Sequence, residues 1–528
     1  MWIEILLGIL TLVALFYVFL KIKWRYWAKK GVYAIEPTFP LGSWPEFFTK
    51  TEHLNDTFLR DGYERAKDLP FYGVYFFGSP ILVVKDAELA KQILVKDFDS
   101  FVDRNGQDVA KMFNTGLRVD KLFMEQMTNA RGETWKNLRT TFTPIFTSGK
   151  MKAMMIFMQE TCKRLIDDID GYAKTGESFE LKKPAGNFSM DTIASCAFGV
   201  DSQAFTNKDS KFVQYASSIF QQTVKDGLKI MFPFLVPNGA KIMGALNISV
   251  GKATEMNFFY DVIMSSLEHR RETKTRRNDL IDLMMDAIKG DIEHDKLGED
   301  EQFEKDAKLK YESKKFEHEE IIIVATALII LVAGYDTTGT TLAFVCYQLA
   351  KNPDIQNRLR EEVQEITNDS DRDITYDDLN KMTYMDQVIS ETLRFHSPIG
   401  VLQRTATKDY KMPGHDLVIS KEGGVWINAV AIHMDPKHYA NPTTFDPEHF
   451  SKEAKLARNP YAYLPFGQGP RGCLGMRFAI MEAKLALANV VRNFNLIPSE
   501  KTQEPLQLDP TTGIAYVKGG LFIKAEKL

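Results

Sequence analysis

The sequence predicts a mainly α (α+β) protein, in which a large helical domain with small β-sheets follows a transmembrane helix. Apolar residues recur with helical periodicity from Ala87 onward and through the segments between Lys150 and Met284. Strand-like pieces are confined to three short stretches. The uncharged run from Ile5 to Leu20 predicts the membrane helix. With 528 residues, 44% of them apolar, the chain can bury a large core as one large domain or two smaller ones.

The N-terminal run, together with Met1 to Ile3, approaches the roughly 20 residues that span a bilayer. A secretory signal peptide would carry its positive charge before the run and small residues at a cleavage site. Here the basic residues follow it, at Lys21, Lys23, Arg25, Lys29 and Lys30. By the positive-inside rule, we expect residues 1–21 to be an uncleaved single-pass anchor in the endoplasmic reticulum membrane, with the body in the cytosol. An amphipathic or cleaved segment is the alternative.

Residues 22–45 form a basic and proline-rich linker, in which "PTFPLGSWP" (Pro37 to Pro45) predicts a stiff, non-helical spacer. The catalytic domain is expected at residues 46–528. Its first predicted strands lie in Tyr72 to Asp86 and turn at Gly78, Ser79 and Pro80. The other strand-like pieces are Val425 to Ile432 and Ala515 to Ile523.

The charged stretch from Lys289 to Glu320 predicts a solvated loop over its first part. The segment after it, "IIIVATALIILVAGYDTTGTTLAFVCYQLAKNP", is apolar on all sides for several turns and stops at Pro353, which predicts a long buried helix. A second membrane span is the alternative. It is disfavoured because the apolar run is shorter than about 18 residues and breaks into Asp336 and several threonines.

The charge balance gives no electrostatic case for a nucleic-acid partner, because 66 basic and 70 acidic side chains leave a net charge of only −4. Four cysteines without paired or zinc-like spacing argue against a disulfide framework and indicate a reducing compartment. The nine histidines show no metal-binding spacing.

The segment "PFGQGPRGCLG" (Pro465 to Gly475) surrounds one cysteine with four glycines and two prolines, just before a helix that is predicted near Leu474. Glycines remove bulk, prolines limit the freedom of the loop, and a helix N-terminus stabilises negative charge. These features suit a thiolate that binds something large and planar. A buried cysteine in a glycine turn is the alternative on composition alone.

The spacing in this loop resembles, position by position, the haem-binding loop of the cytochrome P-450 family of haem-thiolate monooxygenases, through Phe466, Gly469, Arg471, Cys473 and Gly475. The resemblance implies the cytochrome P-450 fold around a buried haem b, with Cys473 as the iron ligand and Phe466 and Arg471 as cofactor-binding residues. "AGYDTT" (Ala333 to Thr338) is similar to the family's oxygen-activation motif. That likeness implies that Asp336 and Thr337 are catalytic residues that deliver protons.

Further landmarks stand in the family's order. "WKNLR" resembles the Trp-x-x-x-Arg helix, which implies that Trp135 and Arg139 bind a haem propionate, and Arg404 occupies another such position. Arg104 is a weaker candidate. "ETLR" (Glu391 to Arg394) matches the family's Glu-x-x-Arg helix and predicts a buried structural lock. In "PEHF" (Pro447 to Phe450), His449 stands where the family has arginine, so we expect a weaker or rearranged lock.

The resemblance implies a monooxygenase that inserts one oxygen atom of dioxygen into lipophilic small molecules, either xenobiotics or steroid- and lipid-like compounds. The chain has no dinucleotide fingerprint. Electrons from NADPH are therefore expected through NADPH-cytochrome P-450 reductase, with cytochrome b5 as a possible second donor. A docking face is expected near Lys136, Arg458, Arg477 and Lys484. "MFPFLVP" (Met231 to Pro237) is expected to dip into lipid and admit dissolved molecules.

Two other functions stay open. The first is a reductase-independent haem-thiolate isomerase or dehydratase, whose relatives usually lack the acid and threonine pair. The second is a non-enzymatic haem- or lipid-binding membrane protein with a decayed site.

Overall fold

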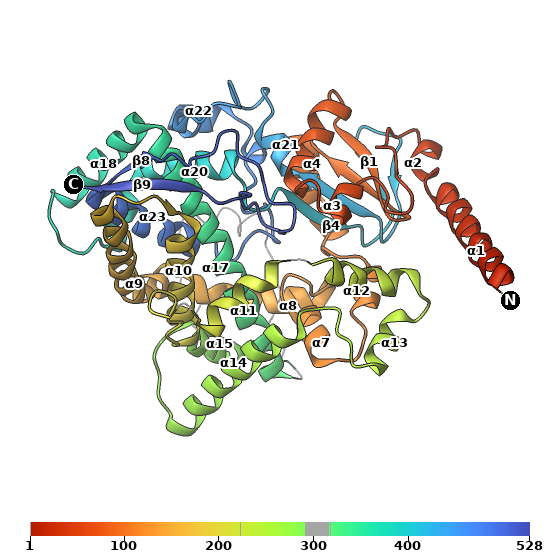
Figure 1. Ribbon diagram of the computed structural model, residues 1–528, viewed down its shortest axis with the longest axis horizontal. Coiled ribbons are helices and arrows are strands. Elements are labelled where there is room, and N and C mark those ends of the chain that lie inside the picture. The colour runs from red at the N-terminus through yellow and green to blue at the C-terminus, as the bar shows by residue number, and fades with distance from the viewer. Residues whose placement is uncertain (1, 208, 222, 291–315, 317) are drawn as a thin grey trace.

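The computed structural model of the chain describes residues 2–207, 209–221, 223–290, 316 and 318–528. Figure 1 shows a helical body with a small sheet region at one end, beside which the N-terminal helix α1 (Trp2–Lys23) projects away from the body. The core of the charged stretch, residues 291–315, lies outside the described residues, so the loop expected there stays a prediction.

The first half of the body consists mostly of short helices, with longer ones at Ser148–Thr175 and Ala253–Thr273. They are α2 (Tyr26–Lys29), α3 (Pro45–Thr49), α4 (Leu54–Arg60), α5 (Ala87–Lys91), α6 (Gln107–Met112), α7 (Arg118–Glu125), α8 (Gly132–Phe142), α9 (Ser148–Thr175), α10 (Lys182–Ile193), α11 (Lys211–Phe220), α12 (Val224–Leu235), α13 (Gly239–Ala245), α14 (Ala253–Thr273) and α15 (Leu280–Lys289). The second half contains α17 (Glu319–Lys351), α18 (Pro353–Thr367), α19 (Tyr376–Lys381), α20 (Thr383–Phe395), α21 (Ala429–His433), α22 (Lys452–Ala457) and α23 (Met476–Asn493).

Single turns of 3-10 or π geometry extend several of these helices. They are η1 (Asp61–Arg65), η2 (Gln92–Lys96), η3 (Phe98–Ser100), η4 (Thr143–Phe146), η5 (Ala194–Phe198), η6 (Pro447–Phe450) and η7 (Pro460–Ala462).

Three small sheets lie within the described part of the chain. The largest has the strand order β1-β2-β7-β4, from β1 (Phe71–Phe76), β2 (Ser79–Val84), β7 (Gly424–Asn428) and β4 (Val401–Thr405). β2 pairs with β7 in parallel, and the other two pairings are antiparallel. A second sheet has the order β3-β9-β8, from β3 (Phe179–Glu180), β9 (Phe522–Lys527) and β8 (Phe494–Pro498), and a third pairs β5 (Tyr410–Lys411) with β6 (Val418–Ile419).

Of the three segments predicted as strands, one is confirmed and two are only partly correct. The hairpin in Tyr72 to Asp86 is confirmed as β1 and β2. The strand predicted over Val425 to Ile432 is correct only as far as Asn428, whose side chain accepts a hydrogen bond from the backbone N–H of Ala431 and so caps α21. The strand predicted from Ala515 is wrong before Phe522, because Gly519 and Gly520 adopt positive φ angles that break an extended backbone.

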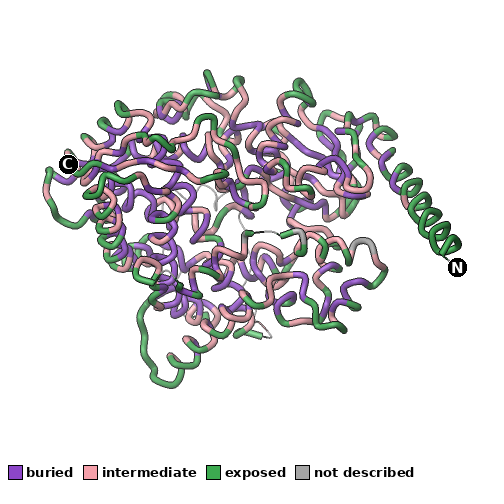
Figure 2. Tube along the Cα trace, in the orientation of Figure 1, coloured by how far each residue is buried: buried purple, intermediate pink, exposed green. Residues whose placement is uncertain are grey.

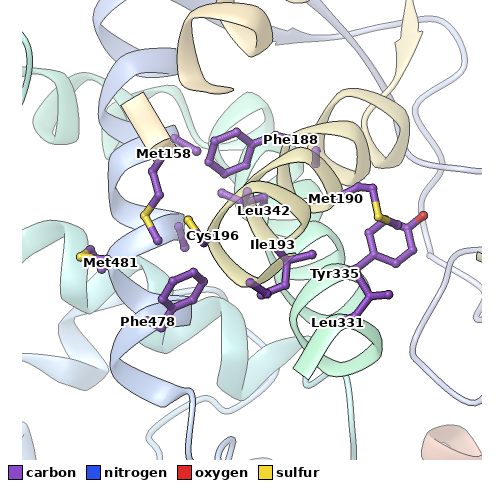
Figure 3. Close-up of a cluster of buried hydrophobic side chains, with 14 of the residues drawn as sticks. Met158, Phe188, Met190, Ile193, Cys196, Leu331, Tyr335, Leu342, Phe478 and Met481 are labelled. Carbon is purple, nitrogen blue, oxygen red and sulfur yellow. The ribbon is translucent and has the colours of Figure 1, made fainter. Parts of the chain in front are cut away.

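The long buried helix is confirmed as α17, which ends at Lys351 just before Pro353. Residues 322–328 and 338–350 of α17 are all buried. Figure 3 shows why, since Leu331, Tyr335 and Leu342 of α17 pack among side chains of the neighbouring α10, α9 and α23. Two helices within the described residues are long and apolar enough to cross a membrane, and this burial makes α17 a core helix rather than the second membrane span.

The other such helix, α1, is exposed along almost its whole length, as Figure 2 shows. This exposure of an apolar N-terminal helix is typical of a membrane anchor.

The chain between α1 and α3, expected to be a linker, is packed against the sheet region at Trp24 and Trp27. The indole nitrogen of Trp24 donates to the Phe77 carbonyl at 2.7 Å, and that of Trp27 donates to the Val74 carbonyl at 3.1 Å. A side chain at Gly73 would collide with the Trp27 ring, at 2.4 Å from its Cδ1 atom. The linker is therefore fixed to β1. The division of the chain at residues 21 and 45 stays a prediction.

Candidate active site

The predicted cysteine loop is a tight, hydrogen-bonded turn before α23. The Cys473 N–H donates to the Phe466 carbonyl at 2.8 Å, and the Gly472 N–H donates to the Gly469 carbonyl at 2.8 Å. Gly469 has a φ of +71°, and a Cβ atom there would lie 2.0 Å from the Leu94 carbonyl oxygen. Only glycine fits this position, because both the backbone conformation and the close approach exclude a side chain.

The thiol of Cys473 lies deep inside the molecule and still has accessible surface, whereas the other three free cysteines are buried. Burial raises the pKa of Cys473, while a hydrogen bond from the Gly475 backbone and the nearby Arg139 and Arg104 lower it. Cys473 therefore has surface that a bound group could contact. A metal cation bound there would deprotonate the thiol.

Three arginines from three other segments lie near this loop. Arg139 of α8 donates to the Gly472 carbonyl at 2.9 Å, and Arg104 donates to the Arg471 carbonyl at 2.7 Å. Burial, followed by repulsion from Arg104, lowers the pKa of Arg404 to about 9, and the Arg404 Nε atom has no hydrogen-bond partner among the described residues. Arg404 is buried, and a buried guanidinium is stabilised by an anionic partner.

Arg471 has its own partners in the protein. Its guanidinium donates to the carbonyls of Val102, Met127 and Ala130, at 2.8, 3.0 and 2.6 Å, and lies 4.2 Å from the centre of the Trp135 ring. Burial, followed by Arg104 and Arg404, lowers the pKa of Arg471 to about 7. These contacts tie the cysteine loop to the chain around α8.

One face of α17 is accessible in the middle of an otherwise buried helix. Ala333 is exposed, and Ile330, Gly334 and Thr337 are partly exposed, so they form a stripe at helical spacing. The Thr337 hydroxyl donates to the Ala333 carbonyl at 2.6 Å. Gly334 also serves packing, because a Cβ atom there would lie 3.0 Å from the Ile193 Cδ1 atom of α10.

Asp336 lies beside this stripe and is fully buried. Its Oδ1 atom accepts hydrogen bonds from Lys182 Nζ, at 2.8 Å, and from the Tyr516 hydroxyl. The acid of the predicted pair therefore points at partners from α10 and from the loop before β9, and only Thr337 lies on the accessible stripe.

The predicted Glu391–Arg394 lock is confirmed as a buried, bidentate pair. Arg394 Nε and Nη2 donate to the two carboxylate oxygens of Glu391, each at 2.7 Å, and both side chains are fully buried. His449 of η6 completes the lock, with its Nδ1 atom 3.1 Å from Glu391 Oε1 and its Nε2 atom 2.6 Å from the Ala440 carbonyl oxygen.

The comparisons with known proteins decide the family. The family model described as Cytochrome P450 matches residues 42–525, which is nearly the whole chain. The chain belongs to the cytochrome P450 family.

Curated relatives agree with this membership. The P450 is 34% identical to cytochrome P450 6B6 of Helicoverpa armigera over 524 residues, which are 99% of this chain and 98% of the relative. It is 33% identical to cytochrome P450 6k1 of Blattella germanica, over 98% of this chain and 96% of the relative, and 34% identical to cytochrome P450 6a2 of Drosophila melanogaster, over 96% of each. The predicted family and its animal branch are confirmed, and the protein is a cytochrome P450 monooxygenase that uses haem.

The residues of this P450 fit the haem that the family implies. An accessible sulfur supplies an iron ligand, and the buried arginine cluster, with the unpartnered Nε atom of Arg404, suits the two carboxylates of haem. We expect Cys473 to hold the iron and Arg104, Arg139 and Arg404 to bind the carboxylates. Haem with a thiolate ligand supplies the chemistry that activates dioxygen.

The described part of this P450 thus brings most predicted site residues to one loop and its neighbours. Phe466, Trp135, Arg139, Arg404 and Arg471 surround or brace the Cys473 loop, and their roles toward haem stay predictions. Lys182 and Tyr516 were missed. No motif marks them, since they lie 154 and 180 residues from Asp336 in the sequence.

A separate surface cavity of about 690 Å³ lies between α14 and the segments at Phe198 to Val200 and Thr275 to Arg277. No residue of the predicted site lines it. It therefore belongs to the periphery of the P450 and not to its active site.

Proposed function

We propose that this P450 is an anchored monooxygenase of the endoplasmic reticulum membrane that hydroxylates lipophilic small molecules with electrons from NADPH-cytochrome P450 reductase. The observation that carries the proposal is that Cys473 and the stripe on α17 that includes Thr337 are both accessible, in a chain of a monooxygenase family. Thr337 supplies a hydroxyl and Asp336 a carboxylate, and positioned groups of these kinds can transfer protons in a reaction.

A separate reductase is proposed because the chain has no nucleotide-binding fingerprint of its own. The exposed apolar helix α1 supports location in a membrane, where such a reductase would meet it. Lys136 and Arg477 are both partly exposed and suit an acidic partner. Lys484 does not, because it is buried and pairs with Asp386 at 2.9 Å. Cytochrome b5 is proposed as a second electron donor, to be tested for docking at the same surface around Lys136 and Arg477.

The substrate class follows from the apolar character of the segments expected near the active site. Exposed apolar side chains support entry of membrane-dissolved molecules, namely Leu228 and Phe232 of α12, Ile242 of α13, and Leu246 directly after α13. Xenobiotics and steroid- or lipid-like compounds are therefore the classes to screen.

The first experiment is the carbon monoxide difference spectrum of the reduced protein, with Cys473→Ser as its partner variant. A strongly red-shifted Soret band that the variant lacks supports thiolate ligation by Cys473. A wild-type band typical of histidine or neutral thiol ligation would contradict the proposal and favour a haem-binding protein without monooxygenase activity. Turnover of lipophilic compounds with and without reductase then separates a monooxygenase from a reductase-independent isomerase.

A further inference from the structure

A basic, exposed stretch of chain joins α14 to α15. It reads "RRETKTRRND" from Arg270 to Asp279, and residues 271–278 are all exposed. Figure 2 shows this stretch in green, where it projects from the body beyond the end of α14. No residue of the predicted active site lies in it. Half of its residues are basic, namely Arg270, Arg271, Lys274, Arg276 and Arg277.

Neighbouring carboxylates balance only part of this positive charge. Three of the cations form ion pairs, Arg270 with Asp279 and Asp282, Arg271 with Glu320, and Arg276 with Asp286. Arg277 donates to two uncharged acceptors, the Gly199 carbonyl and the Ser195 hydroxyl, each at 3.2 Å. Within the described part of the chain, neither Arg277 nor Lys274 has a carboxylate partner. The stretch therefore holds two cations that a further anion could bind.

The hydroxyl of Thr273 lies among these cations and beside open space. Thr273 is the last residue of α14 and is exposed. Its hydroxyl donates to the His269 carbonyl at 2.7 Å and lies 2.8 Å from the Thr275 hydroxyl oxygen. His269 and Thr275 both line the surface cavity of about 690 Å³ described above. A group attached to the Thr273 oxygen thus has unoccupied space next to it.

We propose that Thr273 is a phosphorylation site for a basophilic protein kinase, which is one with an acidic substrate cleft. Arg270 and Arg271 precede Thr273 by three and two residues. Arginine pairs bidentately with carboxylates, and kinases select their substrates by such charge patterns. The Arg271 side chain is 44% exposed, so a cleft carboxylate can replace its surface partner Glu320. The inference does not depend on the proposed function.

The transfer step uses ATP as the phosphoryl donor. A bond forms between Thr273 Oγ1 and the γ-phosphorus, the bond from that phosphorus to the oxygen of ADP breaks, and the hydroxyl proton passes to a base of the kinase. ADP leaves, and no group is oxidised or reduced.

The surrounding charges favour the phosphorylated state. A phosphothreonine carries about two negative charges at neutral pH. The C-terminal end of α14 opposes a negative charge, so a phosphate alone would loosen the last turn of the helix. The unpaired cations Lys274 and Arg277 offset this effect. We expect the phosphate to bind them and to order the chain between α14 and α15.

The competing role is a basic, solvated surface that no kinase modifies. The test incubates the full-length, haem-loaded protein in lipid vesicles with ATP and the catalytic subunit of cAMP-dependent protein kinase, and locates phosphate by mass spectrometry. Thr511 is the matched internal control, because it is also exposed but has no basic residue within four positions. Arg271→Gln removes one recognition charge, and Thr275→Ala removes the neighbouring hydroxyl.

Wild type should gain one phosphate, at Thr273, and Thr273→Ala should gain none. Arg271→Gln should be modified about tenfold more slowly, because one charge-assisted contact with the kinase is lost. Thr275→Ala should match wild type, and Thr511 should stay unmodified. Absence of phosphate from Thr273 while the protein retains haem, or equal modification of Thr511, would overturn the assignment.

A second readout follows the structure of the modified chain. Amide hydrogen exchange over residues 271–278 should slow severalfold in the phosphorylated protein, because the phosphate orders this stretch. The slowing should be lost when Lys274→Gln and Arg277→Gln are combined. Equal exchange before and after phosphorylation would overturn the binding of the phosphate by these two cations.

Discussion

Replacing His449 by arginine should remove a pH dependence from the stability of the Glu391–Arg394 lock. Both ring nitrogens of His449 face oxygen acceptors, Glu391 Oε1 at 3.1 Å and the Ala440 carbonyl at 2.6 Å. A neutral imidazole has one N–H and satisfies only one of them, whereas an imidazolium satisfies both. The hydrogen bond to Glu391 raises the pKa of His449, against the effect of burial and of Arg394.

The raised pKa of His449 determines whether stability rises or falls with pH. Because the pKa in the folded state is raised above the unfolded value of about 6.5, the stabilisation is fully present below that value and is lost as the pH rises through the folded pKa. Deprotonation removes one charge-assisted hydrogen bond, so the free energy of unfolding should fall by about 2 kcal/mol. In a chain of this size that corresponds to a thermal midpoint lower by about 2 °C at high pH.

The assay is the thermal midpoint and haem content of the haem-loaded protein between pH 5.5 and 8.5, at one scan rate because large proteins often unfold irreversibly. His449→Arg should be tolerated or stabilising and should lack the decline that wild type shows, since guanidinium does not titrate in this range. His269→Arg, at an exposed histidine of α14, is the control and should keep the decline. Identical pH profiles for wild type and His449→Arg, or a clear loss of haem in that variant, would refute the reasoning.

Three further changes have defined outcomes. Lys136→Glu should lower reductase-driven turnover severalfold at low salt but not peroxide-driven turnover, and an equal loss in both assays would argue against docking at this face. Gly469→Ala should abolish most carbon monoxide-binding haem, because its Cβ would lie 2.0 Å from the Leu94 carbonyl oxygen, and full haem content would disprove this. Glu482→Gln should raise the thermal midpoint by a few degrees at pH 8 and less at pH 5. Burial raises the pKa of Glu482, whose carboxyl oxygens have no hydrogen-bond partner among the described residues, so the folded state disfavours the charge that the unfolded chain gains as pH rises. Equal effects at both pH values would contradict this.

The cysteine loop and the core helix could be predicted because their signals are local. The glycines that the loop needs lie within ten residues of Cys473, and α17 is marked by one continuous apolar run. The Glu391–Arg394 pair was equally visible, since residues three apart share a helical face.

The surroundings of Asp336 could not be predicted, because its partners come from distant segments and carry no pattern. Lysine at the start of a helix and tyrosine in a glycine-rich loop are ordinary surface features in a sequence. The strand predicted from Ala515 failed for a related reason. The segment is strand-like in composition, but the positive φ angles of Gly519 and Gly520 depend on the tertiary course of the chain.

The packing of Trp24 and Trp27 against β1 has a consequence for how this enzyme would meet its partners. An anchor on a loose tether lets a catalytic domain tumble above a membrane, whereas α1 passes directly into a segment bonded to the sheet. With α1 seated in a bilayer, the domain would keep one inclination and could turn only about the membrane normal. Diffusion to a second anchored protein would then be confined to the plane of the membrane. The same surface of the enzyme would always lie at the same distance from the bilayer.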